Sequence, residues 1–121
     1  MHPFDILANS VLIGHTAFES GDPPMGAAFG RFIPVATYSA VQPAIIQYAG
    51  REVAGIAFAV RVARTKQLIQ CLGVAITDCS SEFGADGLEV AALGIGYPLY
   101  AELFPHHVDA YENSKERVRP T

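Results

Sequence analysis

Residues 9–33 read NSVLIGHTAFESGDPPMGAAFGRFI, and this stretch decides the fold that the sequence predicts. Asn9 to Glu19 is rich in the β-branched and aromatic residues that favour strands. The loop Ser20 to Pro24 interrupts it, because Gly and Asp suit turn conformations and consecutive prolines block a helix. Met25 to Ile33 is then the returning strand, and Pro34 ends the pairing because it has no N–H to donate. The stretch therefore predicts a β-hairpin.

A helix follows this hairpin. Ser39 and Gln42 have the spacing of a capping box, whereas Pro43 suits the first turn of a helix and not its middle. The helix therefore begins either near Ser39 or at Pro43, and Gly50 is a suitable residue to end it.

The remainder of the chain predicts three further strands and a second helix. The strands span residues 52–64, 67–79 and 88–95, with a polar loop before the last of them. The final helix opens at Tyr97-Pro98, and Pro105 inside it predicts a kink or two short helices.

These elements follow one another in the order β-β-α-β-β-β-α. Short links between successive strands favour an antiparallel sheet, so we predict an α+β fold with about five strands and both helices packed on one face. Residues 1–113 are predicted to form a single domain, and residues 114–121 a polar C-terminal tail.

The hairpin supplies the candidate binding residues. If Glu19 pairs with Met25, one sheet face brings together His15, Glu19 and Arg31, with Phe29 opposite His15. A carboxylate near an imidazole can hold its tautomer for acid–base chemistry, and the stiff loop adds Asp22 as a residue for partner recognition. The alternatives are an ordinary exposed sheet face, a dimer surface and a proline-locked turn.

Composition excludes several classes of function. The chain has 121 residues, of which 17% are charged, and its net charge of −4 argues against binding nucleic acid. The densest basic stretch, Arg61 to Lys66, is interpreted as a solvated strand end. The N-terminus lacks the basic region of a signal peptide and no apolar run is long enough to span a membrane, so we expect a cytoplasmic protein with no membrane partner.

Cysteine and histidine patterns predict no metal site and no cofactor. Cys71 and Cys79 would lie about 26 Å apart on one extended segment, too far for a disulfide. His106 and His107 are adjacent, and neighbouring residues on a helix cannot easily share a metal. Gly94-Ile95-Gly96 lacks the third glycine and the following βαβ unit of a dinucleotide site. No catalytic residues are assigned.

The sequence therefore favours a binding protein over an enzyme. The first hypothesis is a small cytoplasmic protein-binding or accessory domain, in its specific form a bacterial toxin-neutralising (immunity) protein; six Arg against two Lys in an Ala-rich chain suggest a GC-rich bacterial source. The alternative is a small-molecule-binding protein or small enzyme with its site between sheet and helices. We also expect a homodimer, formed through the C-terminal helix or through an apolar sheet face that carries Ile13, Ala17, Ala27, Phe29 and Ile33.

Overall fold

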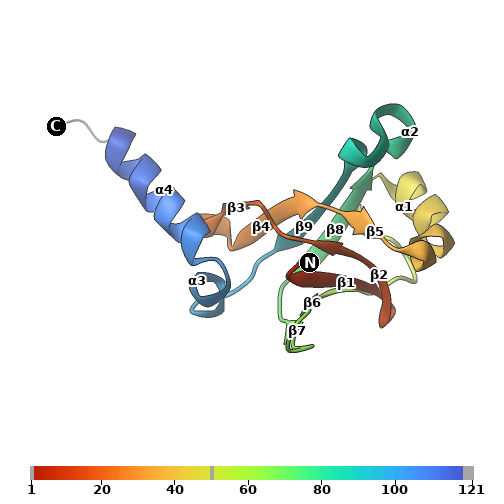
Figure 1. Ribbon diagram of the computed structural model, residues 1–121, viewed down its shortest axis with the longest axis horizontal. Helices are drawn as coiled ribbons and strands as arrows, with labels where there is room; N and C mark the ends of the chain where they lie inside the picture. Colours follow the sequence, from red (N-terminus) through yellow and green to blue (C-terminus); the bar gives the residue numbers. More distant parts are fainter. Residues whose placement is uncertain (1, 50, 119–121) are drawn as a thin grey trace.

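Two antiparallel β-sheets form the body of the protein in the computed structural model, which describes residues 2–49 and 51–118 (Figure 1). The first sheet has five strands in the order β5 (Ile33–Pro34), β2 (Val11–Thr16), β1 (Phe4–Ala8), β6 (Phe58–Val62) and β7 (Leu68–Ile69). The second has four in the order β3 (Ser20–Asp22), β4 (Ala27–Arg31), β9 (Leu88–Leu93) and β8 (Gly73–Asp78). The predicted α+β class with antiparallel strands is confirmed.

Short helical segments connect and flank the strands. The α-helices are α1 (Gln42–Tyr48), α2 (Ser80–Phe83), α3 (Leu99–Leu103) and α4 (Pro105–Val118), and the single 3-10 turns are η1 (Pro23–Met25), η2 (Ala36–Ala40) and η3 (Gly84–Gly87). α1 lies at one end of the body, whereas α3 and α4 lie at the other, with α4 projecting outward (Figure 1). Within the described residues, none of these helices has the length and apolar character needed to cross a membrane.

One continuous segment belongs to both sheets. β4 pairs with β9 in the second sheet, and two residues later β5 pairs with β2 in the first. Phe32 lies at the passage between them, with 1% of its surface exposed and its N–H bonded to the Leu88 carbonyl at 3.1 Å. A Cβ at Gly14 would come within 2.5 Å of the Phe32 ring, so glycine is required where β2 crosses this side chain.

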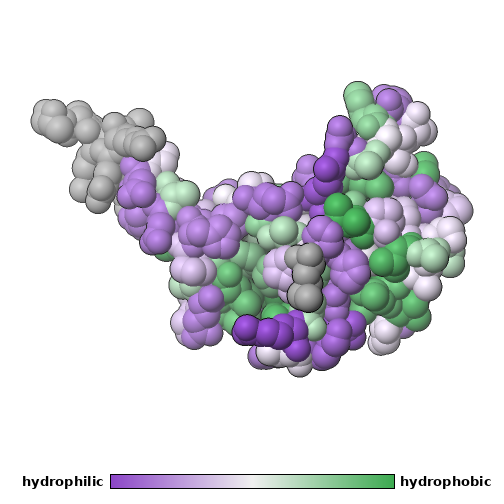
Figure 2. Space-filling model, viewed as in Figure 1, coloured by the Kyte–Doolittle hydropathy of each residue, from purple (hydrophilic) through white to green (hydrophobic). Residues whose placement is uncertain are grey.

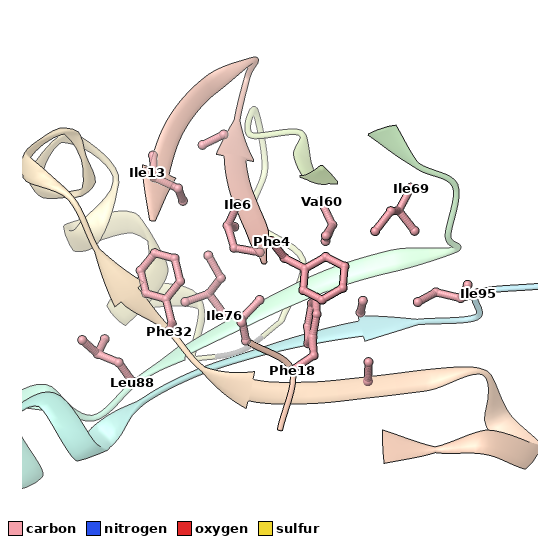
Figure 3. Packing of buried hydrophobic residues seen from close by; sticks show 14 of the residues in the cluster. Phe4, Ile6, Ile13, Phe18, Phe32, Val60, Ile69, Ile76, Leu88 and Ile95 are labelled. Carbon is pink, nitrogen blue, oxygen red and sulfur yellow. The ribbon is translucent and has the colours of Figure 1, made fainter. Parts of the chain in front are cut away.

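The hydrophobic core fills the space between the two sheets. Figure 3 shows Phe4, Ile6 and Val60 of the first sheet pointing toward Phe18 and Ile76. Alternate residues of β1 face this core, as period-2 geometry requires. The Phe18 ring, which has no exposed surface, lies 5.1 Å from that of Phe4, so it fills the region where the two sheets meet.

The predicted hairpin between residues 9–19 and 25–33 is wrong in its pairing. β2 pairs with β1, a strand the sequence analysis did not identify, and β3 is the strand that pairs with β4. The chain turns at Asn9 and Ser10, both with positive φ, which is the geometry of a tight two-residue hairpin turn. Phe18, at φ +47°, then separates β2 from β3.

Other expectations are met more closely. Pro105 does divide the C-terminal helical segment into two helices, α3 and α4, as predicted. Cys71 and Cys79 are both free thiols, as predicted, although Cys71 is half-buried rather than buried. The expected strand 52–64 is shorter, covering only β6, and the polar loop before β9 contains α2 and η3. α4 continues through Val118 into the predicted tail, and residues 119–121 lie outside the described part of the chain.

The apolar face proposed for self-association does not form as predicted. Ile13 and Ala27, two of its expected members, are buried in the protein, with 1% and 2% of their surface exposed. The reason is the pairing of β2 with β1, which turns Ile13 into the core. Self-association itself stays a prediction.

Phe32→Ala tests the role of the buried residue that links β4 of the second sheet to β5 of the first. We expect the free energy of unfolding to fall by about 3–5 kcal/mol, because a buried aromatic side chain is replaced by a cavity. The matched control is Phe83→Ala, whose ring is 64% exposed and whose loss should cost less than about 0.5 kcal/mol. Urea denaturation measures both, and similar losses for the two variants would contradict this assignment.

Candidate functional site

Three of the residues expected in a site do come together. Glu19, Phe29 and Arg31 line a hollow of about 240 Å³ over β4 and β9. The other residues that line it are Ser20, Gly30, Asp86, Leu88 and Glu89. The grouping arises because Ser20 pairs with Phe29 and Arg31 pairs with Glu89 across neighbouring strands.

A second hollow adjoins the first at Glu19 and Ser20. It has a volume of about 380 Å³ and lies between β3 and α4. Its other lining residues are Gly21, Asp22, Pro23, His107, Ala110, Tyr111 and Ser114. The two hollows share Glu19 and Ser20, and we call the pair of them the acidic groove.

The space-filling view shows this part of the surface as a concave saddle. In Figure 2 the surface dips between the projecting α4 and the projection that carries α2, and hydrophilic residues predominate along the dip. A concave surface of this kind is typical of a binding region.

Carboxylates outnumber cations in the acidic groove. Its lining contains four carboxylates, those of Glu19, Asp22, Asp86 and Glu89, against the one guanidinium of Arg31. That guanidinium is ion-paired with Asp86. Glu19 accepts a hydrogen bond of 3.0 Å from the Arg31 backbone N–H. The groove therefore carries an excess of negative charge.

The floor beneath β3 is built by close packing at Gly21. A Cβ there would lie 2.5 Å from the Tyr100 hydroxyl oxygen and 2.8 Å from Cδ2 of His107. The Tyr100 hydroxyl donates to the Ala27 carbonyl at 2.8 Å, and burial, with Tyr97 and Asp22 nearby, raises the pKa of Tyr100 to about 12. Nε2 of His107 lies 2.8 Å from the Phe18 carbonyl, so this histidine attaches α4 to the sheets.

His15 lies apart from the other predicted residues. Its strand partner in the first sheet is Asp5, and its Nδ1 lies 3.0 Å from the Asp5 Oδ1. Arg61 is the partner of Asp5 on the other side; its Nε donates to Oδ2 at 3.0 Å, and its Nη2 forms an ion pair with the same oxygen at 2.9 Å. The expected pairing of His15 with Glu19 is therefore replaced by a pairing with Asp5.

Asp5 is an ionised carboxylate in a nearly closed environment, with 2% of its surface exposed. Burial by itself raises its pKa, but the Arg61 hydrogen bond and charge, the His15 hydrogen bond and the Lys66 charge together lower that pKa below its usual value. Because a carboxylate only accepts hydrogen bonds, His15 donates through Nδ1.

Sequence reasoning missed several of these residues. Asp86, in the loop before the last predicted strand, and Glu89, in that strand, were given no role, and neither was His107, which is buried. Asp5 could have been found from its position between apolar neighbours in Phe4-Asp5-Ile6, which is unusual for a charged residue unless it has partners.

Comparison with protein-family models, curated proteins and solved structures finds no match to this chain. Within the described residues, no group of three or more His, Cys, Asp and Glu side chains has the arrangement needed to hold a metal ion. The function is therefore argued from the two clusters described above.

Asp5→Asn tests the buried carboxylate. Because the folded-state pKa of Asp5 is lowered, its ionised form contributes stability that is fully present above about pH 4 and is lost as the pH falls through the folded pKa. At pH 7 we expect the variant to lose about 2–4 kcal/mol of unfolding free energy. The difference from the unmodified protein should shrink as the pH falls below about 4.

Denaturant unfolding measured between pH 7 and pH 2.5 gives this profile. Asp109→Asn is the matched control, because Asp109 is exposed on α4 and its loss should change the unfolding free energy by less than about 0.5 kcal/mol. A loss at Asp5 that does not vary with pH would refute the ionic role of the carboxylate.

Proposed function

We propose that the protein binds a positively charged segment of another protein in the acidic groove. The observation that carries the proposal is the joining of two hollows into one groove whose carboxylates outnumber its cations. Arg31 offsets only one of the four carboxylates, because its guanidinium is paired with Asp86, and three carboxylates remain without a cation from the groove lining. A concave surface with an excess of one charge attracts ligands of the opposite charge and raises their association rate.

Aromatic side chains in the lining of the groove support a protein partner. Tyr111 on α4 lines the second hollow and is 39% exposed, and Phe29 on β4 lines the first. Aromatic residues of this kind provide much of the binding energy in protein interfaces, whereas surrounding charges set orientation and rate. The groove thus combines an electrostatic centre with aromatic contacts.

In its specific form, the proposal is a cytoplasmic bacterial protein that neutralises a toxin. A toxin that acts on nucleic acid needs a basic surface to bind phosphates. An acidic groove is complementary to such a surface and would cover it by charge and shape. The net charge of −4 supports this form of the proposal.

Asp22→Lys tests the groove with a fluorescently labelled oligo-arginine peptide as the probe. We expect the dissociation constant to rise about tenfold, because the substitution replaces attraction by repulsion at an exposed strand end. Glu52→Lys, which changes the net charge equally outside the groove, should change it by less than about twofold. Fluorescence anisotropy at low and at physiological salt gives both constants.

Equal weakening by the two variants would refute the groove as the binding surface, because only net charge would then matter. For the toxin-neutralising form, the Asp22→Lys variant should also fail to protect cells that express the partner toxin. Protection equal to that given by the unmodified protein would refute that form.

A further inference from the structure

A separate hollow lies on the outer face of the first sheet, over Asp5. Its volume is about 540 Å³, and it is lined by His2, Asp5, His15, Ala63, Arg64 and Lys66. We call it the outer hollow. A volume of this size lies within the range of about 300–1,000 Å³ that small-molecule sites occupy in proteins.

Three neighbouring strands place the charged residues that surround this hollow. His15, Asp5 and Arg61 are direct strand partners across β2, β1 and β6, so their side chains lie side by side on one sheet face. Both oxygens of the Asp5 carboxylate already have partners, Oδ1 with His15 Nδ1 and Oδ2 with the Arg61 guanidinium. Asp5 therefore orients its neighbours and is not a group that a ligand would contact.

Cations are concentrated around this hollow. The chain has only eight Lys and Arg residues, and Arg61, Arg64 and Lys66 all lie here, with Lys66 Nζ 3.6 Å from Asp5 Oδ2. Asp5 is the one carboxylate among the lining residues, so the charge excess is positive. Such an arrangement favours an anionic ligand.

The backbone at Lys66 supports a role for its side chain. Lys66 has φ +64°, in the left-handed region that L-residues with a Cβ adopt at a cost. Glycine would fit the turn without that cost. The Lys66 N–H donates to the Val62 carbonyl at 2.8 Å, so the turn between β6 and β7 fixes this conformation and places the ammonium group beside Asp5 at the outer hollow.

His15 forms part of the wall of the outer hollow. Its Nδ1 donates to Asp5, and its side chain is 29% exposed. The His2 ring stacks against it, with ring centroids 6.0 Å apart.

We propose that the outer hollow is a binding site for a small organic anion carrying phosphate or carboxylate groups. Arg64 and Lys66 bind its negative charge, and the rings of His15 and His2 form the adjoining wall.

Isothermal titration calorimetry with pyrophosphate and with citrate tests the proposal. We expect saturable binding of at least one probe, with the dissociation constant raised about tenfold in Lys66→Gly and in Arg64→Ala, since each removes one charge-assisted contact. Arg51→Gln, outside the hollow, is the control and should leave the constant unchanged.

The thermal midpoint of Lys66→Gly separates a binding role from a structural one. We expect it to be unchanged or higher than that of the unmodified protein, while binding is weakened. If that variant fails to fold, the result for Arg64→Ala decides. Tighter binding of pyrophosphate assigns a phosphoryl ligand, and tighter binding of citrate a carboxylate ligand.

Absence of saturable binding of both probes up to about 10 mM would overturn the proposal. Binding that Lys66→Gly and Arg64→Ala leave unchanged would also overturn it. The Asp22→Lys variant of the acidic groove should bind both probes normally, so this test is independent of the proposed protein partner.

Discussion

The segment from Ala27 to Pro34 belongs to both sheets, and the placement of both candidate sites depends on it. Its first part, β4, pairs with β9 and carries Phe29 and Arg31 into the acidic groove. Its last part, β5, pairs with β2 and has Ile33 opposite His15. Phe32, buried between the two parts, holds the sheets in one relative position (Figure 3). The two sites are therefore fixed to a single rigid framework.

The two sites carry opposite charge although the protein as a whole is acidic. Carboxylates exceed cations in the acidic groove, and cations exceed carboxylates around the outer hollow. The separation has a physical basis in the strand pairing: Asp5 is neutralised by its direct neighbours His15 and Arg61, whereas Glu89 and Arg31 lie beside further carboxylates. A polycationic protein segment and a small anion would accordingly be drawn to different regions of the surface.

Local sequence signals predicted the C-terminal half of the fold better than the N-terminal half. Pro105 divides the last helical segment because proline cannot occupy a helix interior, and this follows from the residue alone. β1 was missed because Asp5 interrupts its apolar run, and the partners that neutralise it, His15 and Arg61, come from strands distant in sequence. The turn at Asn9 and Ser10 was missed because it lacks the glycine that usually marks such turns.

The candidate site residues show the same contrast between features that follow from local sequence and features that depend on strands distant in sequence. Glu19, Phe29 and Arg31 were expected together and do lie together, but the register that was to join them is wrong. They converge because Ser20, the residue after Glu19, lies in β3 and pairs with Phe29. The observed pairing differs from the predicted one, but it still places Glu19 close to Phe29 and Arg31. His15 was separated from them because it pairs with Asp5 on one side and with Ile33, not Phe29, on the other.

The width of the acidic groove depends on Gly21, which has no side chain. α4 forms one wall, and it approaches β3 only because Gly21 leaves room for Tyr100 and His107 beneath the strand. Tyr100 of α3 bonds to the Ala27 carbonyl and His107 of α4 bonds to the Phe18 carbonyl, so each of the two helices is attached to the strands around β3. These contacts satisfy buried polar groups as well as holding the helix, which makes displacement of α4 costly. The groove is consequently a fixed feature of the fold, formed before any partner arrives.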